Sequence, residues 1–267
     1  MKDIVVSIVQ SMLHWEDRAA NLKMFDRLID TITQKTDLIV LPEMFTTGFV
    51  MDPQRLAEPT EGPTLEWMRA KAKEKNAVIT GSVMTKENDK HYNMLLWVRP
   101  DGTFEKYPKR HLFRMAGEDK KFEMGTSRII VELNGWKICP LVCYDLRFPV
   151  WSRQHWTKDG DALKADYDVL LYVANWPEVR SNVWKTLLAA RAMENNSYVV
   201  GVNRIGNDGN FIFHSGDSAI LDFKGVPVKS AIMGKEEIVT AVLSRQLLDE
   251  FRKSFPAGLD ADRFSIQ

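Results

Sequence analysis

The chain has few cysteines, no excess of charge of either sign and no long apolar run. Of its 267 residues, 36 are basic and 36 acidic, so the formal net charge is zero. Nucleic-acid-binding proteins and proteins that adhere to anionic membranes concentrate positive charge, so neither kind of partner is expected. No apolar stretch approaches the roughly 20 residues that a transmembrane helix needs.

The chain also lacks the pattern of a secretory leader. Asp3 precedes the first apolar run, Ser7 and Gln10 interrupt it, and no small-residue cleavage site follows. No stretch is rich in Gly, Ser or Pro, as a linker would be. We therefore expect one domain over residues 1–267, in the cytoplasm.

Cys139 and Cys143 are the two cysteines of the chain. If residues 136–142 form a strand, the two lie about 13 Å apart at about 3.3 Å per residue, whereas a disulfide tolerates a Cα separation of up to about 7 Å. Their spacing, with no His pair nearby, is also a poor zinc pattern. We expect two free thiols in a reducing compartment, with Cys139 in the core.

Short apolar runs alternate with helical patterns along the chain. Helices are predicted over residues 16–34, 63–75, 149–156, 181–195 and 244–253. Strands are predicted over residues 3–10, 37–41, 77–85, 92–98, 103–107, 127–133, 136–142, 168–173, 198–203, 217–223, 225–230 and 238–243. Asn134 and Gly135, between two of these strands, are typical of a type I′ hairpin turn.

This pattern predicts an α/β fold with mixed sheets covered by helices. More than about ten strands rarely remain in one open sheet. We therefore expect four layers, with two mixed sheets packed face to face and helices on their outer faces.

Three reactive side chains each follow a predicted strand. Glu43 follows residues 37–42, Lys109 follows residues 103–108, and Cys143 follows residues 136–142. Strand ends gather at one edge of a sheet, so these side chains can meet there. A thiol that attacks, a carboxylate that removes its proton and an ammonium that stabilises the resulting anion form a complete acyl-transfer set. A strand that turns sharply after its last residue is also how a nucleophile is presented to substrate.

Each of the three residues has a structural interpretation when taken alone. Cys143 could be a buried thiol, Glu43 a charge at a helix start, and Lys109 part of a basic surface patch with Arg110 and His111. Their common position directly after strands favours the catalytic interpretation.

Four short motifs resemble those of a known family: Leu41-Pro-Glu43, Tyr107-Pro-Lys-Arg-His-Leu-Phe113, Cys143-Tyr-Asp-Leu-Arg-Phe-Pro149 and Arg191-Ala-Met-Glu-Asn195. With them the chain resembles the carbon–nitrogen hydrolase (nitrilase) superfamily over essentially its full length. It is most similar to the bacterial ω-amidase branch, which deaminates 2-oxo amides such as 2-oxoglutaramate. The resemblance implies an αββα sandwich, a homodimer, and Glu43, Lys109 and Cys143 as the catalytic triad.

The family also has a second glutamate in the loop after the lysine, seven residues before a glycine. Glu118 and Gly125 have this spacing, so Glu118 is preferred over Glu123. Arg114 follows His-Leu-Phe here, as in a bacterial-type group, whereas eukaryotic ω-amidases have Asp at that position.

The mechanism that follows needs no metal and no organic cofactor. Glu43 accepts the proton of Cys143, whose sulfur attacks the carbon of a small-molecule amide. Lys109 and the backbone N–H of Tyr144 hold the oxyanion. Ammonia leaves, and water activated by Glu43 hydrolyses the thioester. Glu118 holds Lys109 and the leaving amine.

Two pKa effects are expected in this site. Lys109 should favour the Cys143 thiolate by lowering the pKa of the thiol. Two carboxylates near one ammonium should raise the pKa of one carboxylate.

Phe45, Arg147 and Trp176 are the candidate substrate-binding residues. Arg147 suits a substrate carboxylate, but pairing with Asp145 to brace the turn is slightly favoured. Tyr144 is a further candidate for the pocket wall. Arg191 and Glu194, three residues apart on a helix, are expected to form a structural pair.

Three alternatives stay open at this point. A Cys–His dyad using His111 would make the protein a papain-type hydrolase. The second is another carbon–nitrogen hydrolase activity: nitrilase, carbamoyl amide hydrolase or aliphatic amidase. A catalytically silent partner subunit is the third, and the intact set of Glu43, Lys109, Glu118 and Cys143 argues against it.

Overall fold

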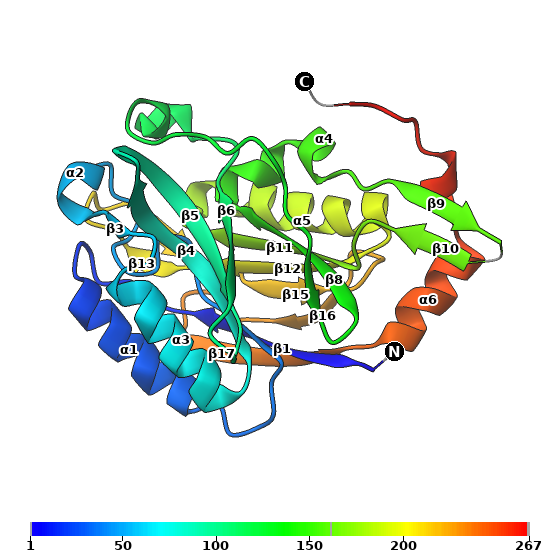
Figure 1. Ribbon diagram of the computed structural model, residues 1–267, viewed down its shortest axis with the longest axis horizontal. Helices are drawn as coiled ribbons and strands as arrows, with labels where there is room; N and C mark the ends of the chain where they lie inside the picture. Colours follow the sequence, from blue (N-terminus) through cyan, green and yellow to red (C-terminus); the bar gives the residue numbers. More distant parts are fainter. Residues whose placement is uncertain (1, 161, 266–267) are drawn as a thin grey trace.

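The computed structural model describes residues 2–160 and 162–265. Two large mixed β-sheets face each other, and helices cover their outer faces (Figure 1). The four-layer α/β arrangement expected from the sequence is therefore confirmed. Residues 1, 161, 266 and 267 of the predicted domain lie outside the described residues.

The first sheet has parallel strands at its centre and antiparallel strands at its edges. β1, β2 and β4 are parallel neighbours, while β17 and β5 pair antiparallel to β1 and β4. The order is β17 (Glu237–Leu243), β1 (Ile4–Gln10), β2 (Leu38–Val40), β4 (Val78–Glu87), β5 (Lys90–Val98) and β6 (Phe104–Pro108), with β3 (Glu58–Pro59) paired to β4.

The second sheet has the same plan. β8, β11 and β12 are parallel neighbours, with antiparallel strands outside them. The order is β16 (Pro227–Ser230), β15 (Ala219–Leu221), β12 (Tyr198–Asn203), β11 (Val169–Ala174), β8 (Trp136–Val142) and β7 (Val131–Leu133). Two small ribbons complete the strands: β9 (Trp156–Asp159) with β10 (Ala162–Ala165), and β13 (Ile205–Asn207) with β14 (Phe213–Ser215).

Alternation along the strands separates the layers. Leu38 and Val40 point into the core between the two sheets, whereas Ile39 packs with the helices outside the first sheet. This is the period-two pattern of a strand that is buried on both faces. The helices that cover the first sheet are α1 (Arg18–Asp30) and α3 (Pro63–Lys75), and α5 (Ser181–Asn195) covers the second (Figure 1).

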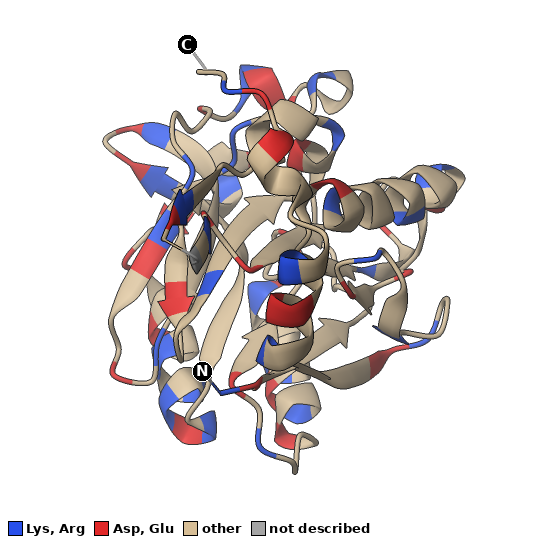
Figure 2. Ribbon diagram, turned by 90° about the vertical axis from the view of Figure 1, so that its right-hand side faces the viewer, with Lys and Arg blue, Asp and Glu red and all other residues tan. Residues whose placement is uncertain are grey.

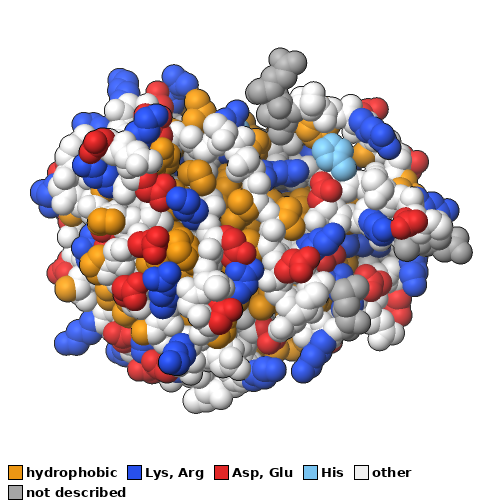
Figure 3. All heavy atoms as spheres, viewed as in Figure 1, with side chains coloured by type: hydrophobic (Ala, Val, Ile, Leu, Met, Phe, Trp, Pro, Cys, Tyr) orange, Lys and Arg blue, Asp and Glu red, His pale blue; other side chains and the backbone are white. Residues whose placement is uncertain are grey.

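The remaining helical segments are short, apart from α6 (Arg245–Ser254). They are α2 (Pro53–Leu56), α4 (Pro149–Ser152) and the 3₁₀ turns η1 (Arg114–Ala116), η2 (Glu118–Lys120), η3 (Cys143–Arg147), η4 (Glu178–Arg180) and η5 (Ala257–Asp260). Within the described residues, no helix is both long enough and apolar enough to cross a membrane. Basic and acidic residues are intermingled along the ribbon (Figure 2), and their side chains are mixed on the face that Figure 3 shows.

Several predicted elements have the boundaries that the sequence indicated. The helices over 63–75 and 181–195 and the strands over 136–142 and 198–203 end at the expected residues. Asn134 and Gly135 both have positive φ, 50° and 83°, as a type I′ turn requires.

The helix expected over 149–156 is wrong beyond its first turn. It ends at Ser152, and the antiparallel pair of β9 (156–159) and β10 (162–165) follows instead. Tertiary contacts explain the change, because the backbone N–H of Gln154 donates to the side chain of Asn195 at the end of α5. The helix expected over 16–34 is shorter as well. It begins at Arg18 because Asp17 caps it by accepting from the N–H of Ala20 at 2.9 Å.

Candidate active site

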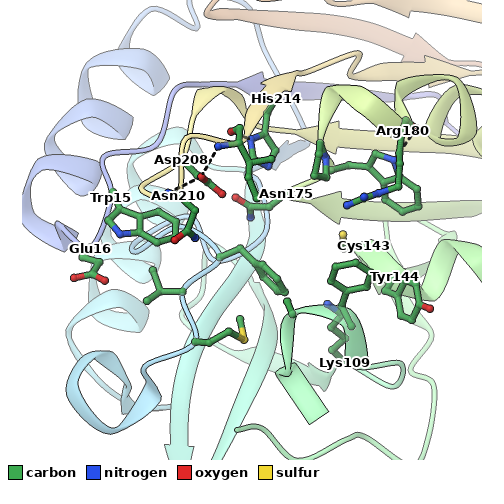
Figure 4. A pocket seen from close by; sticks show the side chains of 18 of the residues that line it. Trp15, Glu16, Lys109, Cys143, Tyr144, Asn175, Arg180, Asp208, Asn210 and His214 are labelled. Atoms are coloured by element: carbon green, nitrogen blue, oxygen red, sulfur yellow. Dashed lines mark hydrogen bonds between the residues drawn. The ribbon is translucent and has the colours of Figure 1, made fainter. Parts of the chain in front are cut away.

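The ends of β6, β8 and β11 meet at one cavity of about 510 Å³, which Lys109, Cys143 and Asn175 help to line. Figure 4 shows Lys109, Cys143 and Tyr144 on one wall, with Trp15 and Glu16 on the opposite side. The lining residues used below are Glu16, Lys109, Phe113, Cys143, Tyr144, Arg147, Asn175, Trp176, Arg180 and Asp208.

Cys143 occupies a sharp turn between β8 and η3. Its φ is 43°, in the left-handed region that costs a residue with a side chain about 1–3 kcal/mol. Asp145 holds this turn by accepting hydrogen bonds from the N–H of Val142 at 3.0 Å and from the hydroxyl of Tyr107 at 2.8 Å. The strained turn presents the thiol at the cavity wall with only 9% of the residue exposed.

Glu43 is fully buried behind the cavity wall, just after β2. Its Oε1 accepts from Lys109 Nζ at 2.9 Å and from Asn93 Nδ2 at 2.8 Å. Its Oε2 accepts from the backbone N–H of Asn175 at 2.8 Å. The carboxylate is therefore held by a residue of β5 and by the residues that follow β6 and β11.

Glu118 lies on the other side of Lys109. Lys109 Nζ is 3.0 and 2.9 Å from its two carboxylate oxygens, and Asn93 Nδ2 donates to one of them at 3.1 Å. Both Lys109 and Glu118 are fully buried. Glu123, by contrast, is on the surface at 3.4 Å from Lys90. The structure thus brings Glu118, and not Glu123, to the lysine.

Gly125 fixes the path of this loop. Its N–H donates to the backbone carbonyl of Lys109 at 2.9 Å. A Cβ at this position would lie 2.1 Å from the carbonyl oxygen of Pro108, which no real side chain tolerates. Glycine therefore allows the loop to return against the end of β6 and place Glu118 beside Lys109.

The electrostatics of the site keep Lys109 charged. Burial acts to lower its pKa, but the negative charges of Glu118 and Glu43 outweigh burial and raise it. Burial raises the pKa of Glu118, Lys109 opposes that shift, and Glu43 adds to it. The expectation that one carboxylate has a raised pKa is confirmed for Glu118.

The pKa of the Cys143 thiol is raised well above its ordinary value of 9.0. Burial is the largest cause, Glu43 adds to it, and Lys109 acts in the opposite direction. Lys109 thus acts to lower the pKa of the thiol, as expected, but burial and the carboxylate of Glu43 outweigh this effect. The thiol is neutral at rest, so a base must take its proton as it attacks.

Tyr144, Arg147 and Trp176 line the cavity as predicted, but Phe45 does not. Phe45 is fully buried in the layer between the first sheet and its helices. Its ring packs edge-on against Phe25, with ring centroids 5.4 Å apart. Its side chain leaves the strand end on the face opposite to the cavity, so the prediction of Phe45 as a substrate-binding residue is corrected.

The preferred role of Arg147, pairing with Asp145, is also wrong. The oxygens of Asp145 accept from Tyr107, Val142 and His111. Arg147 instead places its guanidinium carbon 5.2 Å from the ring centroid of Trp176. The expected pair of Arg191 and Glu194 is confirmed, with Nη1 and Oε1 3.0 Å apart.

The Cys–His dyad is not formed with His111. Its Nδ1 lies 2.7 Å from Asp145, and its ring stacks on Phe148 with centroids 3.8 Å apart. The charged groups that act on the Cys143 thiol are Glu43 and Lys109. His111 therefore supports the turn from outside the cavity.

Sequence reasoning missed the role of two asparagines. Asn93 bridges Glu43 and Glu118, and Asn175 bonds both the side chain and the backbone of Glu43. The only signal for Asn93 was a lone amide beside the apolar run of its strand. Asn175 shares the position of the catalytic residues, directly after a strand.

The comparisons with known proteins cover the whole chain. The sequence model of the Carbon-nitrogen hydrolase family matches residues 5–253. The chain is 46% identical to "Omega-amidase YafV" of Escherichia coli strain K12 over 100% of both chains. It is 33% identical to "2-oxoglutaramate amidase" of Bacillus subtilis strain 168, over 94% of this chain and 95% of that one.

A solved structure is similar over the same length. It is the crystal structure of XC1258 from Xanthomonas campestris, described as a CN-hydrolase superfamily protein with an arsenic adduct in the active site. The TM-score is 0.96 and the sequence identity 44%, with 100% of both chains covered.

Proposed function

The chain belongs to the carbon–nitrogen hydrolase family, and we propose that it is an ω-amidase. It cleaves the terminal amide of a small dicarboxylate monoamide, such as 2-oxoglutaramate or 2-oxosuccinamate, to the acid and ammonia. The observation that carries the proposal is the buried contact of Lys109 with Glu43 and Glu118 beside the thiol of Cys143. Full-length relatives named for this activity support the choice of substrate class.

The first half of the proposed reaction forms a thioester. Glu43 takes the thiol proton as Cys143 attacks the amide carbon, because the thiol has a raised pKa. The carbonyl oxygen becomes an oxyanion between the charged Lys109 and the N–H of Tyr144. Loss of one such donor typically costs a factor of about 10²–10³ in rate. Glu43 then returns the proton to the nitrogen, and ammonia leaves.

The second half regenerates the enzyme. Water enters the place of ammonia, and Glu43 removes its proton as it attacks the thioester carbon. The acid product leaves, and the proton returns to the sulfur. Glu118 keeps Lys109 in place through both halves, and Trp176 and Arg147 contact the substrate.

Release of ammonia from 2-oxoglutaramate tests the proposed function. We expect turnover by the wild type and by Cys139→Ala, whose thiol is a core group, and none by Cys143→Ala. Glu43→Gln should release ammonia far more slowly because both halves of the reaction use this base, and mass spectrometry should locate any acyl adduct on Cys143. A nitrile that turns over faster than the amide, or an adduct on Cys139, would contradict the proposal.

We further propose that residues 1–267 form one domain and that two copies form a cytoplasmic homodimer. One core cluster contains side chains from both sheets, which supports a single domain. Val150 on α4 and Met193 on α5 are 55% and 52% exposed, and a dimer interface would cover them. A nucleophilic thiol suits a reducing compartment. Sedimentation velocity measures the oligomeric state.

A further inference from the structure

Two guanidinium groups on the cavity wall lack a partner of opposite charge. Arg147 lies at the end of η3, and Arg180 lies at the end of η4. Among the described residues, neither side chain forms an ion pair or donates a hydrogen bond. Arg180 was not singled out by the sequence, and Figure 4 shows it on the side of the cavity where Cys143 and Tyr144 lie.

Each guanidinium lies near an aromatic ring of the cavity wall. The Cζ of Arg147 is 5.2 Å from the ring centroid of Trp176, and that of Arg180 is 5.6 Å from the ring centroid of Phe113. Contact with a ring engages the face of a guanidinium and leaves its N–H edge available. That edge matches the two oxygens of a carboxylate.

The ring beneath Arg147 is itself fixed and linked to Arg180. The indole N–H of Trp176 donates to the backbone carbonyl of Arg180 at 2.8 Å. Its backbone N–H donates to Oδ1 of Asn203 at 2.7 Å, and the residue is 4% exposed. The two arginines therefore stand on one connected wall, which reduces the ordering that a ligand would otherwise have to impose.

The acidic residues of the cavity lining have other partners. Glu16 pairs with Arg55. Asp208 accepts from the backbone N–H groups of Asn210 and Ile212 at 2.8 and 2.9 Å. The positive charge of Lys109 on the wall is balanced by the carboxylates of Glu43 and Glu118 behind it. Within the described residues, neither acidic side chain of the lining pairs with Arg147 or Arg180, so both guanidinium groups are free to bind an anionic ligand.

We infer that Arg180 and Arg147 together bind the free carboxylate of the amide substrate. Arg180 is therefore a specificity-determining residue. The inference rests on the proposed ω-amidase function and specifies how the enzyme selects its substrate. The two guanidinium groups hold the acid end, and the amide end reaches Cys143. An amide without a carboxylate leaves both charges unpaired and is bound weakly.

Kinetics with paired substrates test the inference. Arg180→Gln should raise KM for 2-oxoglutaramate about 10- to 100-fold, as expected for loss of a charged hydrogen bond. The change for butyramide, which has an amide but no carboxylate, should be less than about threefold. Arg180→Lys should recover part of the affinity because it keeps the charge but not the fork.

Arg114→Gln is the matched control. Arg114 is on the loop near the cavity, 84% exposed and 3.3 Å from Asp119, and it does not line the cavity. Arg114→Gln removes the same charge without changing the cavity wall. The kcat and KM for both substrates should therefore equal those of the wild type. Equal losses in Arg114→Gln and Arg180→Gln would overturn the inference in favour of a general field effect. Equal losses of Arg180→Gln on both substrates would overturn it in favour of a structural role.

Binding without turnover separates this inference from the proposed function. In the Cys143→Ala background, calorimetry with 2-oxoglutarate should show binding that weakens about 10- to 100-fold when Arg180→Gln is added. If the wild type releases no ammonia from 2-oxoglutaramate but this binding difference remains, the proposed function fails and the carboxylate site stands. If binding is unchanged by Arg180→Gln, the carboxylate site is refuted even when turnover is observed.

Discussion

The two cysteines show how surroundings, more than exposure, decide what a thiol does. Both are buried, and burial raises the pKa of Cys139 to about 12. Cys139 lies within β8 in the core, whereas Cys143 ends the turn after that strand beside Glu43 and Lys109. Only Cys143 therefore has both a base and access to a cavity.

The resting thiol should react with alkylating agents as a group of high pKa. In a Cys139→Ala background, the rate of modification by iodoacetamide should have its midpoint above pH 9, since burial and Glu43 raise the pKa of Cys143. Glu43→Gln removes the negative charge, so the midpoint should fall although amidase activity is lost. The rate measured from pH 6 to 11 shows whether reactivity rises at a lower pH in Glu43→Gln than in the parent protein. An unchanged or higher midpoint in Glu43→Gln would show that the carboxylate does not act on the thiol.

At the scale of elements, loops after strands carry the chemistry, and their paths depend on local sterics. The loop after β6 contains Glu118 and returns to β6 at Gly125. The turn after β8 contains Cys143 and is held by Asp145. Both loops are fixed by contacts with neighbouring strands, and so the catalytic groups are positioned before substrate arrives.

Gly125→Ala should lower kcat by more than its loss of folding stability can explain. The added Cβ would overlap the carbonyl oxygen of Pro108 at 2.1 Å, so the loop must move and Glu118 with it. We expect a loss of about 1–3 kcal/mol in the free energy of unfolding and a kcat reduced by at least about tenfold. Urea unfolding and ammonia release measure the two quantities.

Gly102→Ala is the control for this prediction. Gly102 has a φ of 85° in a surface turn, and no atom lies within 4 Å of the added Cβ. The left-handed conformation should cost about 1–2 kcal/mol, which is similar to the Gly125 variant, but kcat should not change. Equal effects of the two variants on kcat would mean that stability, and not the position of Glu118, limits activity.

At the scale of the whole molecule, a buried ion cluster attaches the C-terminal helix to the second sheet. Asp168, just before β11, is 2.8 Å from Arg245 and 2.7 Å from Arg252, both on α6. Burial acts to raise the pKa of Asp168, but the two arginines and the N–H of Lys137 outweigh it and lower the pKa. Residues more than 70 positions apart are joined in this way.

Asp168→Asn should destabilise the protein by about 3–5 kcal/mol at pH 7, because two buried guanidinium groups lose their counter-charge. The folded pKa lies below the unfolded value, so this stability is present above about pH 4 and is lost as the pH falls through the folded pKa. The difference between the variant and the wild type in urea unfolding should therefore shrink toward pH 3.

Asp249→Asn serves as the comparison for the ion cluster. Asp249 is 3.7 Å from Arg245 and 43% exposed, so its loss should cost less than about 1 kcal/mol at any pH. If Asp168→Asn is as mild as this variant, or if its effect does not depend on pH, the cluster does not hold α6 in place.

The sequence by itself determined most of the element types, the layer order and the three reactive residues. Period-two alternation, apolar run lengths and the Asn134–Gly135 turn are local patterns, and each depends on a few neighbouring residues. The positions of Glu43, Lys109 and Cys143 directly after strands were visible for the same reason. The spacing between Glu118 and Gly125 gave the fourth residue through the family resemblance.

Only the tertiary structure decided which side chains meet. Phe45 follows a strand as the catalytic residues do, yet it faces the helices. Asn93 joins two carboxylates from within β5, and Arg147 contacts Trp176 in place of Asp145. The net pKa of the Cys143 thiol depends on burial. The contacts of a side chain, the direction in which it points and its desolvation depend on segments far apart in the chain, and no local pattern encodes them.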